Sequence, residues 1–435
     1  MPPSPPAPAD AGPPTRARHW VVVFAGALAV ITYIDRTCLA QAKVAMSGDL
    51  GLSSVQMGYV FSAFFWAYAA FEIPGGWLGD RIGPRKVLIR VVVLWSFFTA
   101  ATGRVWNQAS LLVTQFLFGA GEAGAFPNLA KIFTHWLPSR ERNRAVSIMW
   151  LATRWGAAAT PILVVWVISL VGWRWAFAVF ALPGFAWALA FFLWFRDDPA
   201  RHPGVNAAEA RLIAESRPAP GAPSRVPWAK ILRSRSVWLL CLQYFCFGYG
   251  WYFYITWLPT YLREARGFTL QRGALLAGLP LFLGGISCVF SGWLVGWLEN
   301  RGHPLARVRK ILACVGFWGA ALLLFALPRI SDATWAMAAM GLASFSLDLS
   351  LPVTWRTAMD IGGKYAGTVS GTMNTAAQIA GALSPVVIGY ILEYMNHNWT
   401  LTFVISAAIY GIGGLCWMGI DPVTPIEPLP SPLSP

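Results

Sequence analysis

Two long apolar stretches of this 435-residue chain are joined by Gly76-Trp77-Leu78-Gly79-Asp80-Arg81-Ile82-Gly83-Pro84-Arg85-Lys86. Glycines in such a position let neighbouring helices approach closely. The Asp80 carboxylate can cap a helix or pair with the basic side chains Arg81, Arg85 and Lys86. The segment therefore predicts a tight connection between two helices, with a polar latch at one membrane face.

The rest of the composition agrees with a membrane protein. Hydrophobic residues make up 56% of the chain and charged residues only 12%, whereas a soluble domain carries about 25% charged residues. Windows of about 20 apolar residues can cross about 30 Å of hydrocarbon. We expect an all-α protein with twelve transmembrane helices, starting near positions 20, 56, 86, 109, 144, 173, 236, 270, 308, 332, 364 and 399.

The net charge of +14 could indicate a nucleic-acid partner, but the basic residues alternate from loop to loop. With the N-terminus placed inside, 23 of the 33 Lys and Arg residues lie in inner segments and 7 in outer ones. This positive-inside pattern predicts that both termini are cytoplasmic and that no nucleic acid binds. Arg36, Arg90 and Arg154 lie within the spans, and Arg90 is close enough to a span end to snorkel.

A polar, proline-containing stretch divides the spans into two sets of six. We expect a disordered cytoplasmic tail at 1–19 and a first six-helix bundle at 20–195. A cytoplasmic linker at 196–235 leads to a second six-helix bundle at 236–420 and a second cytoplasmic tail at 421–435. The halves also echo one another, because Glu122 lies five residues before Pro127 and Asp348 lies four before Pro352. Repeats of this kind usually place a binding site between them at mid-membrane.

The latch segment resembles the signature loop of the major facilitator superfamily. Its second copy, Gly292-Trp293-Leu294-Val295-Gly296, lacks the acidic residue. Tyr33-Ile34-Asp35-Arg36, the span-four segment from Phe118 to Pro127 and the segment from Ser370 to Pro385 are similar to the anion:cation symporter family. The resemblance covers positions 20 to 420. It implies the major facilitator fold and carriage of sugar acids or aromatic carboxylates with protons.

Ionisable residues inside apolar spans are costly and therefore candidates for function. Arg36 and Arg154 carry guanidinium forks that match a carboxylate, so we expect them to bind the substrate anion. Glu122 and Asp35 are the expected proton carriers, and Asp348 is a candidate acid in the second half. In the family an arginine commonly precedes the span-four glutamate, but here Gln115 stands there. Depth along the helices therefore predicts a Glu122–Arg154 pair.

Each assignment has a structural alternative. Asp35 and Arg36 could form an ion pair that fixes helix packing, Arg154 could only brace Glu122, and Asp348 could bind a backbone group. Glu72 shares a helix face with Tyr68 and stays open between a span-end residue and a functional acid. Neutral polar side chains are expected to shape the pocket: Tyr33, Tyr68, Gln115, Tyr249, Tyr252, Asn374 and Gln378.

Enzymatic chemistry is not indicated. The six cysteines have no metal-ligand spacing, and no metal site, cofactor or nucleophile–base pair is expected. Gly119-x-Gly121-x-x-Gly124 matches a dinucleotide fingerprint only formally, because no strand precedes it.

We therefore predict a monomeric secondary transporter in a bacterial inner membrane that imports an organic anion with protons, with Na⁺ left open as the coupling ion. An exporter of drugs or metabolites and a transporter-like nutrient receptor are the alternatives.

Overall fold

The computed structural model describes residues 13–52, 54–215, 226–258, 261–262, 265–267, 270–395 and 398–427, and within these residues all regular elements are helical. The first half contains α1 (Ala17–Leu50), α2 (Ser54–Ile82), α3 (Pro84–Thr102), α4 (Gln108–Glu122), α5 (Ala125–Trp136) and α6 (Ser139–Trp194). The connection contains η1 (Pro199–Arg201), α7 (Ala207–Ala214) and α8 (Trp228–Arg233). The second half contains α9 (Arg235–Thr256), α11 (Leu270–Asn300), α12 (Leu305–Ala326), η2 (Leu327–Arg329), α13 (Ala333–Asp348), α14 (Ser350–Gly362), η3 (Gly363–Tyr365), α15 (Ala366–Tyr394) and α16 (Trp399–Gly419).

These helices differ from the predicted spans at three places. The predicted fourth span is two helices, α4 and α5, and the tenth is likewise α13 followed by α14. The predicted fifth and sixth spans form the single element α6, in which Gly172 adopts φ 75° and turns the chain. Among the described residues, six stretches are long and apolar enough by composition to cross a membrane. The count of twelve therefore stays a prediction.

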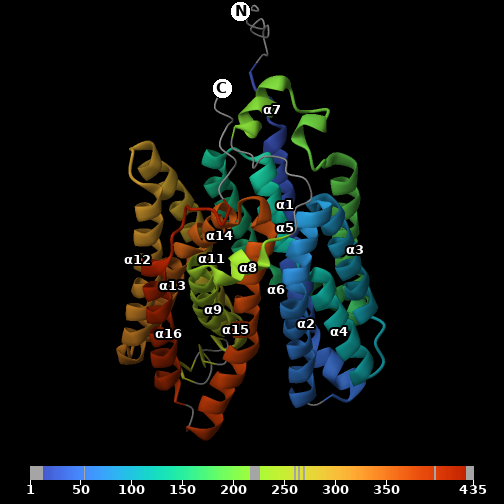
Figure 1. The fold of residues 1–435 in the computed structure, drawn as a ribbon. Helices are drawn as coiled ribbons and strands as arrows, with labels where there is room; N and C mark the ends of the chain where they lie inside the picture. Colours follow the sequence, from blue (N-terminus) through green and yellow to red (C-terminus); the bar gives the residue numbers. More distant parts are fainter. Residues whose placement is uncertain are drawn as a thin grey trace, which may run out of the picture.

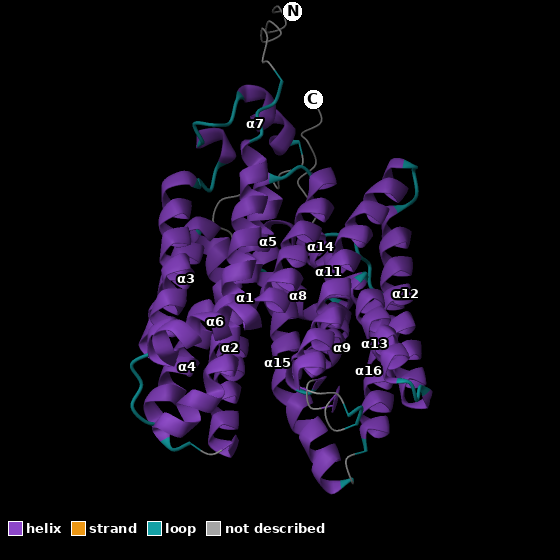
Figure 2. Cartoon of the chain, turned by 180° about the vertical axis from the view of Figure 1, so that it is seen from behind, coloured by secondary structure: helices purple, strands orange, loops and turns teal. Residues whose placement is uncertain are grey.

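The two halves stand side by side. The helices of the first half gather on one side and those of the second half on the other, and α1 begins at the end that carries α7 (Figure 1). We call this end of the molecule the α7 end. Figure 2, seen from behind, has the same two groups of long purple helices. Large apolar side chains remain exposed on the helix surfaces, Ile162 at 78% and Leu322 at 70% among them, as expected where lipid covers the protein.

The halves meet mainly where α2 packs on α15 and α6 packs on α11, and α5 and α14 add smaller contacts with the other half. Small residues permit this close packing, because a Cβ atom on Gly76 would collide with the backbone of Gly367. Similarly, a Cβ on Gly292 of α11 would collide with Ser147 of α6. The predicted role of glycines in close helix approach therefore applies here between the bundles.

The latch segment lies at the α7 end of this interface. The Asp80 carboxylate accepts hydrogen bonds from the Thr368 backbone N–H at 2.7 Å and from its hydroxyl at 2.6 Å, at the start of α15. It also pairs with Lys131 at 2.7 Å. A second cross-bundle contact joins the Arg356 guanidinium to the Ser139 carbonyl at 2.9 Å. The α7 end is thus held closed by contacts between the two halves.

The other latch residues stay within the first half. Arg81 lies over the Trp77 ring at 5.2 Å, and the Arg85 backbone N–H donates to Asp197 at 2.9 Å. Gly83 has φ 90°, in the left-handed region that favours glycine. A Cβ on Gly79 would collide with the Asn128 amide, and Lys86 is exposed.

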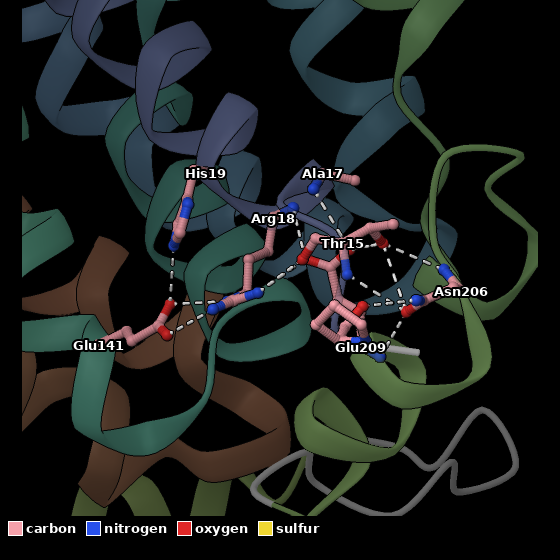
Figure 3. Close-up of polar contacts among 8 residues, drawn as sticks. Thr15, Ala17, Arg18, His19, Glu141, Asn206 and Glu209 are labelled. Atoms are coloured by element: carbon pink, nitrogen blue, oxygen red, sulfur yellow. Dashed lines mark hydrogen bonds and ion pairs between the residues drawn. The ribbon is translucent and has the colours of Figure 1, made fainter. Parts of the chain in front are cut away.

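The connection between the halves is anchored to the first bundle around Glu209 of α7. This fully buried carboxylate accepts from the Thr15 hydroxyl at 2.5 Å and from the Ala17 and Arg18 backbone N–H groups at 3.2 and 3.1 Å (Figure 3). Arg18 pairs with it and, through two nitrogens, with Glu141 at the start of α6. A negative charge on the first N–H groups of α1 also complements the helix dipole.

The predicted tails and linker are therefore partly ordered. Residues 1–12 and 428–435 lie outside the described residues, as does 216–225 of the linker. Residues 13–19 begin α1 and bind the linker, while Glu427 pairs with Lys364 at 2.7 Å. The domain boundaries stay a prediction, and the start of α1 at Ala17 lies three residues before the expected one.

Candidate functional site

The first buried ion pair joins α1 to the end of α4. The Arg36 guanidinium contacts one Glu122 carboxylate oxygen through two nitrogens, at 2.7 and 2.6 Å. The Glu122 side chain is 1% exposed and that of Arg36 is 16% exposed. The guanidinium also lies near three aromatic rings, with centroids at 5.6, 5.1 and 4.9 Å for Tyr33, Phe64 and Tyr68. Such rings stabilise a buried cation.

A break between helices positions Glu122. It is the last residue of α4, and α5 begins three residues later, after Gly124 with φ 87°. Gly124 lies against Gly75 of α2, where a Cβ on either residue would come too close to the other. Pro127 follows in the first turn of α5, where the missing N–H of a proline is tolerated. The local sequence therefore ends one helix at the acid and starts the next.

The second buried ion pair joins the two halves. Arg154 of α6 contacts Asp348 of α13 at 2.5 Å, and both side chains are almost fully buried. The guanidinium stacks over the Trp251 ring of α9, 3.3 Å from its centroid. A Cβ on Gly284 of α11 would collide with the Asp348 carboxylate. Four helices thus converge on one charge pair.

Asp348 in the second half lies at a position similar to that of Glu122 in the first half. Each acid is the last residue of a helix, α13 or α4, and a second helix containing a proline in its first turn follows at once. The repeated spacing in the sequence therefore corresponds to a repeated structural feature. The two junctions differ in backbone, because Ala123 and Gly124 leave the helical region between α4 and α5, whereas Leu349 between α13 and α14 keeps φ −57° and ψ −33°.

The predicted Glu122–Arg154 pair is wrong. Glu122 pairs with Arg36, and Arg154 pairs with Asp348. Depth along a helix was the basis of the prediction, but depth does not fix the direction in which a side chain points. Glu122 points toward α1, whereas Arg154 points across to the second half. The alternative ion pair within Asp35–Arg36 does not form either, because adjacent residues on a helix do not face each other.

Asp35 lies buried beside this site, and no residue in the described part of the chain forms an ion pair with it. Its side chain belongs to a residue that is 3% exposed, and neither carboxylate oxygen accepts a hydrogen bond from the described residues. The Tyr68 hydroxyl is likewise buried without a hydrogen-bond partner among those residues. Unsatisfied buried polar groups are rare in folded proteins, so these groups mark the centre of the first bundle as a candidate functional site.

The neutral polar residues that were expected to shape one pocket make hydrogen bonds to different partners. The Tyr252 hydroxyl donates to Gln378 at 2.8 Å, while the Gln115 amide donates to the Thr102 hydroxyl at 3.0 Å. Asn374 faces α2 instead of a pocket, donating to Glu72 at 2.6 Å. The Tyr249 hydroxyl is buried with no hydrogen-bond partner among the described residues.

Sequence reasoning gave too little weight to Glu72. Its side chain is fully buried and accepts from the Gly124 backbone N–H at 2.5 Å as well as from Asn374. The signal was present, because Glu72 stands one helical turn after Tyr68 and just before Pro74-Gly75-Gly76. Trp251 and Phe64, which contact the two arginines, were not singled out. Aromatic residues are too common in apolar spans to be distinguished there.

Known transporters match this chain over most of its length. A family model described as Major Facilitator Superfamily matches residues 25–385. A probable sulfoacetate transporter of Cupriavidus necator is 37% identical, over 95% of this chain and 96% of the relative. A probable galactarate/D-glucarate transporter of Escherichia coli is 32% identical, over 92% of each chain.

Among solved structures, a proton:xylose symporter bound to 6-bromo-6-deoxy-D-glucose superposes with a TM-score of 0.75. The match covers 95% of this chain and 97% of the symporter at 14% identity. At that identity the likeness concerns the fold alone.

Proposed function

The chain belongs to the major facilitator superfamily, and from this premise we propose that it imports a small organic anion together with protons by alternating access. It is a transporter and not an enzyme, as its relatives are. The observation that carries the proposal is the pair of guanidinium groups, Arg36 and Arg154, held at the centre of the helices by carboxylates. A substrate carboxylate can replace an internal carboxylate on an arginine fork with little geometric change.

The balance of buried charges supports coupling to protons. Two guanidiniums and four carboxylates, Asp35, Glu72, Glu122 and Asp348, lie in this central region. If all were ionised, an arriving anion would add to an existing excess of negative charge, which is costly in a low-dielectric interior. Protonation of Glu122 would remove one charge and free Arg36 for the substrate. Asp35, which forms no ion pair within the described residues, is the second proposed proton carrier.

The relatives support the choice of substrate class. Sulfoacetate carries a carboxylate and a sulfonate, and galactarate and glucarate each carry two carboxylates. We propose a substrate of this chemistry, a sugar acid, a sulfonated acid or an aromatic carboxylate. Tyr33, Tyr68, Tyr249, Tyr252 and the amides of the site would contact its hydroxyl groups or ring.

The proposed arrangement in the membrane follows the sequence. Twelve spans would form bundles 20–195 and 236–420, with both tails and the linker 196–235 in the cytoplasm. The α7 end would then be the cytoplasmic face. We propose a monomer in a bacterial inner membrane, with H⁺ as the coupling ion and no further cofactor.

A transport assay in proteoliposomes tests the role of Glu122. With a pH gradient imposed, Glu122→Gln should abolish accumulation of substrate, while exchange of labelled for unlabelled substrate continues. Asp332→Asn is the matched control, since this exposed acid caps α13 and asparagine is an equally good cap. Accumulation by Glu122→Gln at the rate of the control would contradict the assignment, and accumulation driven by a Na⁺ gradient alone would replace H⁺ as the coupling ion.

The substrate class is tested by a thermal-shift screen of the purified protein. Sulfoacetate, galactarate, aromatic acids, neutral sugars and organic cations would be compared at pH 5.5 and 7.5, because a bound ligand stabilises the folded state by mass action. An acid should raise the unfolding temperature where its neutral analogue does not, and the shift should fall in Arg154→Gln. Stabilisation by cations alone would favour an exporter instead.

A further inference from the structure

Glu72 lies where three parts of the molecule meet. Its carboxylate receives the Gly124 backbone N–H from the α4–α5 break at 2.5 Å and the Asn374 amide from α15 at 2.6 Å. The first contact is within the N-terminal bundle, and the second crosses to the other half. One buried side chain of α2 therefore ties the break that holds Glu122 to the interface between the bundles.

The backbone of α2 around Glu72 packs closely on α15 and on the α4–α5 break. A Cβ on Gly371 of α15 would lie 3.0 Å from the Glu72 carbonyl oxygen, and the Thr375 hydroxyl lies 3.5 Å from the Ala69 carbonyl. On the other side, the Asn128 amide donates to the Gly75 and Gly124 carbonyls at 3.0 and 2.7 Å. The α2–α15 contact and the α4–α5 break are thus both tightly built around Glu72.

The charged groups that act on Glu72 are those of the first ion pair. Tyr68, one turn before Glu72 on α2, lies against the Arg36 guanidinium, so Arg36 and its partner Glu122 lie beside the α2 face that carries Glu72. The Asp35 side chain points away from that of Arg36, because adjacent residues on a helix do not share a face. If Glu122 loses its charge, Glu72 is the carboxylate on the α2 face toward which Arg36 already points.

We propose that Glu72 is a positioning residue that couples the charge state of Glu122 to the opening of the α7 end, an inference that rests on the function proposed above. While Glu122 is ionised it holds Arg36, and Glu72 holds Asn374 and keeps α15 against α2. When Glu122 takes up a proton, Arg36 loses its counter-charge and attracts Glu72. The Asn374 contact is then released, and with it one of the bonds that close the α7 end.

Two substitutions separate the charge of Glu72 from its hydrogen bonds. In Glu72→Gln, the amide oxygen can accept from Gly124 while its NH₂ donates to Asn374, provided that the Asn374 amide turns over. This variant keeps both contacts and removes the charge. Asn374→Leu does the reverse, because it keeps the carboxylate and removes the bond to α15.

The opening can be measured without substrate by the distance between two spin labels at the α7 end. The labels are placed at Arg144→Cys on α6 and Arg307→Cys on α12, which are exposed positions on opposite halves. The parent protein without these two cysteines measures the background signal from the native cysteines, and this signal is subtracted. Glu122→Gln should add a longer-distance population, and so should Asn374→Leu. Glu72→Gln should stay closed, and Glu72→Gln combined with Glu122→Gln should also stay closed.

The double variant decides the proposal. If it opens as far as Glu122→Gln alone, Glu72 is only structural and the coupling is wrong; if neither Glu122→Gln nor Asn374→Leu opens the α7 end, the inference also fails. Unfolding temperatures of all variants, measured in the same detergent, show which are folded. The transport assay distinguishes this from a failure of the proposed function, because accumulation that survives Glu122→Gln contradicts that function whatever the label distances are.

Discussion

The two central ion pairs, Arg36–Glu122 and Arg154–Asp348, are alike in chemistry and different in placement. Arg36 and Glu122 both belong to the first half, whereas Arg154 and Asp348 lie on opposite halves. Transporters of this kind work largely by rocking one bundle against the other. A pair within one bundle can keep its geometry during that motion and exchange a proton or an anion. A pair between bundles must instead either lie on the axis about which the bundles rotate or dissociate during the motion.

The pairs also differ in their surroundings. Arg36 retains 16% exposure of its side chain and rests on three rings, while Arg154 is 1% exposed and rests chiefly on Trp251. Water can therefore compensate Arg36 more readily than Arg154. This difference predicts a ranking of mutational effects.

The largest effect is expected for Asp348→Asn. Arginine cannot give up its proton inside a protein, so the variant leaves a buried cation without a counter-charge at a cost of about 3–5 kcal/mol. Unfolding in mixed SDS and detergent micelles would measure the loss. The double variant Arg154→Gln with Asp348→Asn should recover most of it, and a double variant as unstable as the single one would remove the distinction between the two pairs.

Glu122→Gln should cost less, about 1.5–3 kcal/mol, which is the worth of a hydrogen bond to a charged group. The Arg36 guanidinium keeps its aromatic contacts and its access to water. The same unfolding assay, compared with Asp332→Asn as control, provides the test. A loss equal to that of Asp348→Asn would mean that Arg36 is as isolated from water as Arg154.

Trp251→Phe addresses the ring on which Arg154 stacks. A smaller ring is a weaker partner for a cation, and we expect a loss of about 1 kcal/mol. In the background of Arg154→Gln with Asp348→Asn the same substitution should cost less, since the cation is gone. Equal costs in both backgrounds would assign the effect to packing volume.

Tyr68→Phe should lower the free energy of unfolding by less than about 0.5 kcal/mol, because this fully buried hydroxyl makes no hydrogen bond to the described residues that the variant would lose. The hydroxyl has no hydrogen-bond partner among the described residues, and the ring that contacts Arg36 remains. Substrate affinity, read from the thermal shift, is the informative measurement. Weaker binding at unchanged stability would identify the hydroxyl as a substrate contact, whereas reduced stability would indicate a structural one.

The sequence was sufficient for the all-helical superfamily fold and for the four charges of the two central ion pairs, but not for how those charges pair. Apolar windows predicted helices along most of the chain, but nothing in the latch segment predicted its contact with α15. Arg36, Glu122, Arg154 and Asp348 were all recognised because charge is rare in such spans. Their pairing depends on the direction of each side chain around its helix and on which helices are neighbours across the bundle. Neither quantity follows from position along one chain.

Glu72 illustrates the same limit. The sequence left Glu72 open between a span-end residue and a functional acid, but the α4–α5 break brings the Gly124 backbone N–H beside it. That donor exists only because Gly124 turns the chain, and a prediction of one continuous fourth span concealed it. A broken helix can thus create a binding partner for a residue on another helix, which periodicity along either helix does not reveal.

The contact of Glu209 with the beginning of α1 has a consequence for biogenesis. The chain is made from its N-terminus, so the first N–H groups of α1 must wait for about 190 further residues before the carboxylate that binds them emerges from the ribosome. By then all of α6 has been synthesised. Docking of α7 therefore follows the synthesis of every helix of the first half. A ribosome-bound chain stalled before residue 209 would contain all of those helices, but the first turn of α1 would not yet be bound by Glu209.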